Sequence, residues 1–236
     1  MLNGMQSSPG SDLLGQCAKK YGTILADPPW RFSNRTGKMA PEHRRLSRYG
    51  TMTNEQIMEL PVAQLAAEQA HLYLWVPNAL IAEGLEVMKR WGFTYKTNLI
   101  WYKVRKDGGP DRRGVGFYFR NVTELILFGV RGRLRTAQMG RTQPNIVSTQ
   151  KRGHSRKPDE LYPIIEGCSP GPYLEMFARY KRPNWDQWGN EIEQNGSHLR
   201  YYPQYGGSEN GLEKQRAVAR LFSDSKILPL YARKSG

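Results

Sequence analysis

The stretch YGTILADPPW, residues 21–30, decides how this chain is organised. Its first six residues are apolar or small and indicate a short buried strand. Two consecutive prolines then end that strand, because neither has an N–H group to donate to a sheet ladder. The chain therefore leaves the sheet at an acid, two rigid imino acids and an indole, and this corner is the first candidate for chemistry.

Strands and helices alternate along the rest of the chain, which predicts an α/β sheet with helices on its faces. Apolar runs predict strands over residues 21–26, 71–76, 93–103, 122–130 and 173–178, the last followed by a loop rich in Trp and Asn. Helices are expected over residues 53–69, 78–91 and 158–166. Thr53 opens the first with capping-box spacing, and Asn78 caps the second, in which Ile81, Leu85 and Met88 share one face.

One main domain is expected over residues 21–194, after a loose lead-in over residues 1–20. Residues 195–236 are turn-rich, with a short amphipathic helix over 211–223, and form either a wrapping extension or an arm for a partner. The chain has no membrane-spanning apolar run and no features of a secretion signal at its start, so we expect a cytoplasmic protein without a membrane partner.

The basic charge is large and unevenly placed. A formal net charge of +14 indicates a polyanionic partner or an anionic surface. The loop from residue 103 to residue 120 carries Lys103, Arg105, Arg112 and Arg113 and is interleaved with aromatic residues. Phosphates pair with such cations and bases stack on such rings, which suits a nucleic-acid strand. The alternative is a solvated basic face with ordinary core aromatics.

Metal chemistry is not indicated. Cys17 and Cys168 are far apart and lack a CxxC partner, so they are expected to be packing residues. The histidines show no metal-ligand spacing.

The groups at Asp27–Trp30 suit the activation of an aromatic amine. Such an amine is a poor nucleophile because its lone pair is delocalised into the ring. The Asp27 carboxylate and a backbone carbonyl accepting its two N–H bonds would favour a pyramidal nitrogen, since both acceptors gain strength as positive charge develops. The prolines fix the carbonyl direction, and the indole of Trp30 can stack on a flat base.

This pattern resembles the S-adenosylmethionine-dependent amino-methyltransferases, whose catalytic tetrapeptide is Asp or Asn, Pro, Pro and an aromatic residue. More narrowly, the chain resembles the family named after the seventy-kilodalton subunit of the mRNA N6-adenosine methyltransferase, in its bacterial and phage DNA adenine methyltransferase branch. The resemblance covers about residues 21–192 and rests on motifs in the family's order: YGTMT (49–53), LYLWV (72–76), IWYK (100–103), TELILFGV (123–130), SRKPDELY (155–162) and RPNWDQWGNE (182–191). It implies a Rossmann-like methyltransferase fold in the permuted order, with the catalytic tetrapeptide before the cofactor strand.

The resemblance also implies the catalytic residues. In the family, the acid and the following proline carbonyl bind the target N6 amine, which assigns these roles to Asp27 and Pro28, with Pro29 and Trp30 beside the base. Tyr49 matches a tyrosine in a loop that closes over the active site, and a plain turn before the next helix is the alternative.

The cofactor residues implied by the resemblance lie late in the chain. Lys157 matches a lysine that contacts the carboxylate end of S-adenosylmethionine, and Arg179 follows the cofactor strand. Asn190 and Glu191 stand where the family holds the ribose hydroxyls. The segment before residue 21 matches poorly the one that cradles the adenine of the cofactor, so those contacts do not carry over.

Two further residues are expected near the nucleic acid. Lys103 matches a family lysine close to the target nucleotide, with a strand-end salt bridge as the alternative. Glu124 matches a glutamate near the substrate loops, and an ion-pair role is the alternative.

The leading hypothesis is methyl transfer from S-adenosylmethionine to adenine N6 in nucleic acid, with DNA favoured over RNA, by direct in-line attack. A homo- or heterodimer is compatible with it. The alternative is a catalytically inactive, nucleic-acid-binding partner subunit of such an enzyme. Methylation of a glutamine or a small amine is a third possibility, which the basic loops disfavour.

Overall fold

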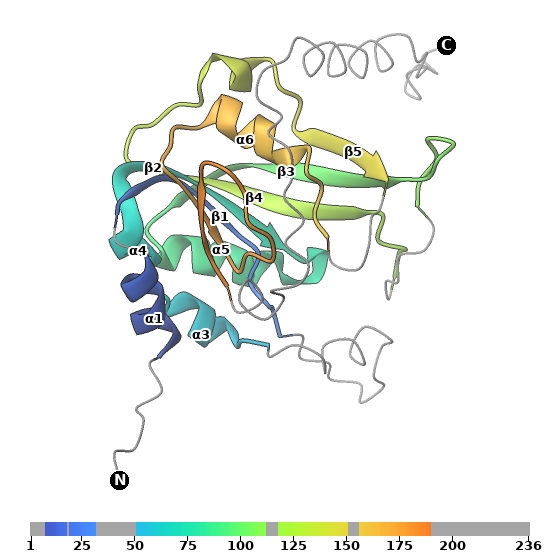
Figure 1. Cartoon of the computed structure of the whole chain (residues 1–236). Coiled ribbons are helices and arrows are strands. Elements are labelled where there is room, and N and C mark those ends of the chain that lie inside the picture. The colour runs from blue at the N-terminus through green and yellow to red at the C-terminus, as the bar shows by residue number, and fades with distance from the viewer. Residues whose placement is uncertain (1–7, 18, 32–50, 112–117, 151–155, 190–236) are drawn as a thin grey trace, which may run out of the picture. The chain divides into compact units, whose positions relative to one another are not determined.

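Within the described residues, seven strands form one mixed sheet in the order β5-β3-β4-β2-β1-β6-β7 (Figure 1). The computed structural model describes residues 8–17, 19–31, 51–111, 118–150 and 156–189. The strands are β1 (Tyr21–Ala26), β2 (Ala66–Val76), β3 (Thr94–Val104), β4 (Thr123–Arg131), β5 (Ile146–Gln150), β6 (Tyr173–Met176) and β7 (Trp185–Trp188). The helices are α1 (Pro9–Gln16), α3 (Asn54–Met58), α4 (Val62–Leu65), α5 (Ile81–Arg90) and α6 (Leu161–Cys168), with short 3-10 helices η1 (Asn78–Leu80) and η2 (Gln138–Arg141). The predicted α/β fold class is confirmed.

Strand direction brings several chain ends to one edge of the sheet. In the described sheet only β4 runs against the other strands, pairing antiparallel with both β2 and β3. The carboxyl ends of β1, β2, β3 and β6 therefore meet the amino end of β4. Leu25 of β1 lies opposite Glu175 of β6, so the strand that leads into the DPPW tetrapeptide adjoins the expected cofactor strand.

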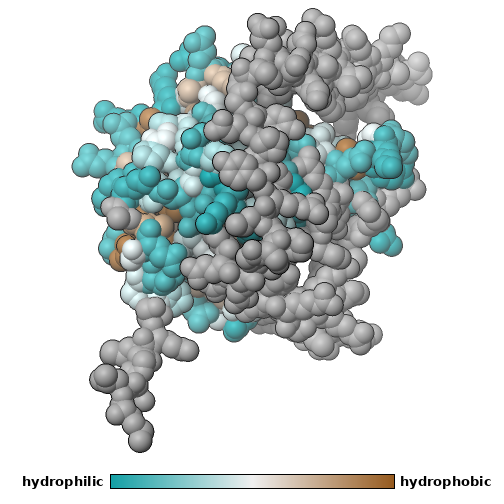
Figure 2. Space-filling model, viewed as in Figure 1, coloured by the Kyte–Doolittle hydropathy of each residue, from teal (hydrophilic) through white to brown (hydrophobic). Residues whose placement is uncertain are grey.

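Alternate residues of the central strands face two separate apolar clusters. On β2, Leu72 and Leu74 pack in the cluster that includes residues of α1, α3 and α5, whereas Tyr73 and Trp75 pack in the cluster that includes residues of α6. Figure 1 shows α5 and α6 on opposite faces of the sheet. Because both faces are covered, β1 is buried along its whole length, which explains its uninterrupted apolar sequence. The described residues on the face shown in Figure 2 are mostly hydrophilic.

The contact of α5 with the sheet depends on Gly84. A Cβ atom at Gly84 would lie 2.6 Å from Cγ2 of Val76, so a larger residue would push the helix away from β2. The expected apolar face of α5 is only partly right, since Met88 is buried but Ile81 and Leu85 are exposed. The close approach of Gly84 to β2 determines which face of α5 is buried. The prediction from apolar residues instead placed the larger side chains, Ile81 and Leu85, on that face.

All three expected helices differ from the structure in their bounds or their capping. The helix expected over residues 53–69 keeps its capping box at Thr53 but is divided into α3 and α4, because Pro61 cannot continue it. Its last four expected residues, 66–69, are not helical and instead begin β2. The side-chain amide of Asn78 donates to the carbonyl oxygen of Thr123 (3.2 Å) and does not cap α5. Helix α6 begins three residues later than expected, at Leu161.

Three short elements were not expected from the sequence: α1, β5 and β7. Helix α1 lies within the expected loose lead-in, where Ser8 caps it and Leu13 is fully buried. Strand β7 lies in the Trp-rich loop after β6. Elements of four to eight residues carry too few positions for a clear periodic pattern.

The structure leaves some expectations untested. The extension over residues 195–236 and its helix lie outside the described residues, and the domain boundaries stay predictions. In the part of the chain that the structure describes, no helix has the length and apolar character needed to cross a membrane.

Candidate active site

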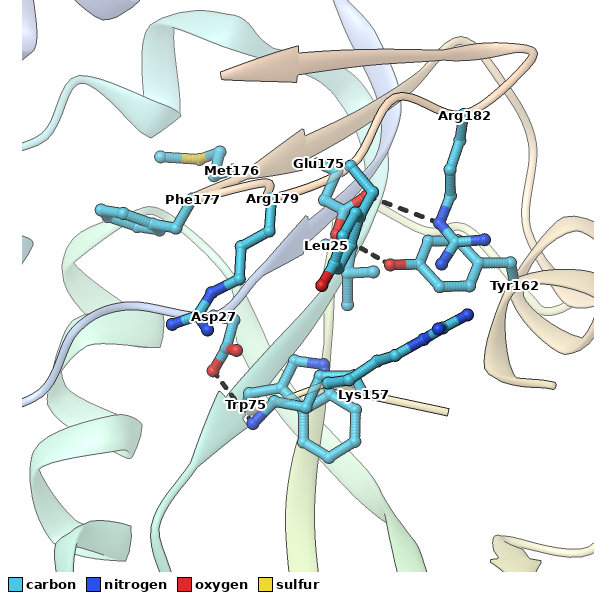
Figure 3. A pocket seen from close by; sticks show the side chains of 12 residues that line it. Leu25, Asp27, Trp75, Lys157, Tyr162, Glu175, Met176, Phe177, Arg179 and Arg182 are labelled. Atoms are coloured by element: carbon cyan, nitrogen blue, oxygen red, sulfur yellow. Dashed lines mark hydrogen bonds and ion pairs between the residues drawn. The ribbon is translucent and has the colours of Figure 1, made fainter. Parts of the chain in front are cut away.

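A pocket opens at the carboxyl edge of the sheet, where β1, β2 and β6 end (Figure 3). It holds about 460 Å³ of space between atoms, part of it open to solvent. The side chains that supply its polar and aromatic walls include Asp27, Trp75, Lys157, Glu175, Phe177 and Arg179. Strand order thus gathers residues from distant parts of the sequence at the edge where α/β sheets bind their ligands.

Main-chain hydrogen bonds hold the tetrapeptide in a turn directly after β1. The N–H of Trp30 donates to the carbonyl oxygen of Pro28 (2.8 Å), and the N–H of Met52 donates to the carbonyl oxygen of Pro29 (2.9 Å). A carbonyl oxygen has two lone pairs, so that of Pro28 retains one for a ligand.

The indole of Trp30 is part of the core. The residue is 4% exposed, and its indole N–H donates to the main-chain oxygen of Trp75 (2.9 Å). The expected stacking of Trp30 on a target base is therefore wrong for this structure. Because a buried indole N–H needs an acceptor, the contact instead fixes the tetrapeptide to the end of β2.

Lys157 joins two carboxylates. Its Nζ lies 3.3 Å from Oδ1 of Asp27 and 2.9 Å from Oε2 of Glu124, and it stands 4.4 Å from the ring centroid of Trp75. The other oxygen of Glu124 accepts a hydrogen bond from Lys103 (2.5 Å). Figure 3 shows the contact between Lys157 and Asp27. The structure thus places four of the expected site residues in one continuous chain of charges.

This chain of charges changes the protonation of its members. Burial raises the pKa of Asp27 above its ordinary value; Lys157 opposes that shift and Glu124 adds to it. Burial also disfavours the Glu124 carboxylate, but Lys157 and Lys103 outweigh it and lower the pKa of Glu124 to about 2. The pKa of Lys157 is raised, since Asp27 and Glu124 together outweigh the effect of burial. Asp27 is therefore the more readily protonated of the two carboxyl groups.

A second polar network, which the sequence pattern did not reveal, lies around Glu175 at the end of β6. The hydroxyl of Tyr162 donates to Oε1 of Glu175 (2.7 Å), and Nε of Arg182 lies 3.9 Å from Oε2. The guanidinium of Arg182 covers the Tyr162 ring at 3.4 Å and donates to Asp159. Burial raises the pKa of Glu175 to about 7, although Tyr162 and Arg182 oppose the shift. The sequence did contain one sign of this site, because Glu175 is an acidic residue within the strand expected over residues 173–178.

The pocket residues fit the amino-acid end of S-adenosylmethionine. Oε2 of Glu175 is buried and has no hydrogen-bond partner within the described residues, so it can accept from an ammonium group. Lys157 offers an ammonium group to a carboxylate in the same pocket. Phe177 adopts a φ of 63°, a conformation that is rare for a bulky residue and often found at ligand sites.

Of the remaining expected residues, the structure describes Arg179 and Arg105, and the others lie outside the described part of the chain. Arg179 lines the pocket and points toward Asp27 (Figure 3), whereas Arg105 lies in the turn after β3 and pairs through two nitrogens with Asp107 at 2.7 and 3.0 Å. The residues outside the described part of the chain are Tyr49, Arg112, Arg113, Asn190 and Glu191.

Other polar groups have structural roles. Asp12 of α1 accepts a hydrogen bond from the indole N–H of Trp188 (2.8 Å) and so attaches α1 to β7. Cys17 and Cys168 are buried free thiols, as expected for packing residues. Among the residues described, no three His, Cys, Asp or Glu side chains are grouped to hold a metal ion.

Comparisons with known proteins agree with the motifs in this pocket. Residues 21–191 match the MT-A70 family. The chain is 31% identical over 184 residues to the N(6)-adenosine-methyltransferase catalytic subunit METTL3 of Homo sapiens, covering 76% of this chain and 29% of that protein. It is 31% identical over 178 residues to the N(6)-adenosine-methyltransferase MT-A70-like protein of Drosophila melanogaster, covering 74% of this chain and 27% of that protein.

A bacterial relative matches over most of its length. The chain is 28% identical over 199 residues to the type II methyltransferase M.MunI of a Mycoplasma species, covering 75% of this chain and 80% of that protein. By contrast, the chain spans less than a third of the length of the N(6)-adenosine-methyltransferases that it matches.

Proposed function

Because the chain belongs to the MT-A70 family of S-adenosylmethionine-dependent methyltransferases, we propose that it methylates the N6 amine of adenine in nucleic acid. One observation carries the proposal. Asp27 follows β1 at the edge of the pocket that also contains Lys157 and Glu175, so an amine acceptor and groups for a zwitterionic cofactor share one site. The names of the relatives support adenine N6 as the target.

The chain's residues would act on the nucleophile. S-adenosylmethionine supplies a methyl group on a sulfonium sulfur, which leaves with the electron pair of the S–C bond as the N6 lone pair forms the N–C bond. Asp27 and the carbonyl oxygen of Pro28 accept the two N–H bonds of the amine, and both contacts strengthen as positive charge develops on nitrogen. The raised pKa of Asp27 suits it to take up the proton that N6 then releases.

DNA is the favoured nucleic acid. The similarity to a bacterial type II methyltransferase supports this choice. In a duplex the adenine would have to leave the base stack, because N6 is engaged in pairing and the acceptors lie inside a pocket. The tetrapeptide after β1 precedes β6 in the chain, and this order supports the proposal of a permuted methyltransferase.

The test is methyl transfer from labelled S-adenosylmethionine into single-stranded DNA, duplex DNA and RNA, followed by mass spectrometry of the nucleosides. We expect N6-methyladenine, most of it in DNA. Asp27→Ala removes the acceptor and should lower the single-turnover rate by about 100-fold or more while the calorimetric affinity for the cofactor persists. Glu86→Ala, which removes an exposed carboxyl on α5, is the matched control and should keep the wild-type rate.

Other outcomes would overturn the proposal. Label on cytosine or on protein would assign a different acceptor. Oligonucleotide binding without any cofactor binding would instead identify the chain as an inactive partner subunit.

A further inference from the structure

Two adjacent aromatic side chains project from the surface shortly before β4. Tyr118 and Phe119 are 95% and 85% exposed, whereas most other aromatic residues of the described structure are buried or half-buried. A single exposed apolar residue needs no explanation, but two adjacent and almost fully exposed rings make a contact surface that packing does not account for.

This aromatic pair lies near the pocket. The carbonyl oxygen of Val122 accepts a hydrogen bond from the main-chain N–H of Lys103 (2.8 Å). Phe119 and Val122 are three positions apart, so their Cα atoms lie within about 11 Å of each other. Two residues after Val122, Glu124 contacts Lys157 in the pocket. A polymer whose one unit enters the pocket would therefore have neighbouring units within reach of the aromatic pair.

The surroundings of the aromatic pair are basic. Arg120 follows it directly, and the turn after β3 exposes Lys106 and also Arg105, which pairs with Asp107. Cations beside exposed rings are the combination that binds unpaired nucleotides, because phosphates pair with the cations and bases stack on the rings. The formal net charge of +14 favours such a polyanion over an apolar protein partner.

We propose that Tyr118 and Phe119 stack on unpaired nucleobases that flank the target adenine. The proposal rests on the proposed function and adds that the enzyme binds a strand that is single or locally opened. Every base has a flat face, so the aromatic pair contributes affinity without reading sequence.

The first experiment measures the affinity of the full chain for a fluorescent single-stranded DNA with one central adenine. The double variant Tyr118→Ala/Phe119→Ala should bind roughly 10- to 100-fold more weakly, and Tyr118→Phe should bind like the wild type. Tyr95→Ala is the matched control: Tyr95 is 43% exposed but stands at the opposite end of β3 from the pocket. An unchanged affinity of the double variant, or an equal loss in Tyr95→Ala, would overturn the proposal.

The second experiment separates stacking from charge. Abasic nucleotides on either side of the adenine should weaken binding by the wild type but not further weaken binding by the double variant; equal weakening of both would reject stacking. The double variant should keep the salt dependence of binding, whereas Lys106→Ala should reduce the slope by about one phosphate contact.

These binding measurements do not depend on methyl transfer. If the wild type methylates no adenine but the affinity differences persist, the proposed function fails and the stacking surface stands. If the double variant binds and methylates with wild-type KM, the stacking surface fails and the proposed function stands.

Discussion

The ammonium nitrogen of Lys157 lies 3.3 Å from Oδ1 of Asp27, so the residue expected to hold the cofactor also pairs with the residue expected to hold the target amine. One side chain thereby connects the two halves of the proposed reaction. Removing the charge of Lys157 or of Asp27 must therefore change the pKa of the other residue, and this change can be measured from the pH dependence of activity.

Replacing Lys157 by Met should move the acid limb of the pH–rate profile to higher pH. Lys157 lowers the pKa of Asp27 against the larger effect of burial, so its removal raises that pKa further. The proposed mechanism requires Asp27 as an ionised acceptor, so activity should then appear at a higher pH. The measurement is kcat against pH at saturating cofactor. Lys157→Arg keeps the charge and should keep the limb in place; an unmoved limb in Lys157→Met would contradict the ion pair.

Glu124→Gln should remove a part of the acid sensitivity of the fold. The pKa of Glu124 is lowered from 4.5 to about 2 in the folded protein, so the unfolded chain takes up this proton first as the pH falls. The stabilisation is present above pH 4.5 and is lost progressively toward pH 2. Urea unfolding at a series of pH values should show a shallower decline in Glu124→Gln than in the wild type. The exposed variant Glu86→Gln should decline like the wild type, and parallel curves for all three would refute the assignment.

His71 should stay neutral well below the pH at which free histidine becomes charged. Its ring is fully buried, its Nδ1 lies 2.7 Å from the hydroxyl of Ser169, and burial lowers its pKa. The unfolded chain therefore binds a proton more readily, and stability falls as the pH drops below about 6.5. NMR titration of the ring protons measures the folded-state pKa directly. A midpoint at or above 6.5 would be incompatible with this burial.

Gly84→Ala should destabilise the fold by about 1 to 3 kcal/mol, the usual range for an overpacked core. The new methyl group would stand 2.6 Å from Cγ2 of Val76, and α5 would have to move. Urea unfolding checks the size, and the double variant Gly84→Ala/Val76→Ala should recover part of the loss. Gly15→Ala in α1 is the control, since no atom outside its own turn lies within 4 Å of the added methyl; it should be neutral or slightly stabilising.

Several features of the site were predictable because they depend on local chemistry. Two prolines after an apolar run can only end a strand, and this rule alone predicts Asp27 at a sheet edge. Thr53 and Gln56 form their capping box within one turn of chain. Lys157 and Glu124 were found through the order of motifs, but the sequence offered an ion-pair role for Glu124 without naming a partner.

Other features depend on long-range packing and could not be predicted from the sequence. Glu175 enters the site because β6 pairs in register with β1, and that register joins residues about 150 positions apart. The same packing buries Trp30 against the end of β2 and turns Gly84, not Leu85, toward the sheet. The order of residues specifies where strands end and which chemical groups stand there, because dihedral preferences and missing N–H groups act within a few residues. The folded sheet specifies which of these groups meet and which are buried, because desolvation and charge pairing depend on neighbours that the linear order does not define.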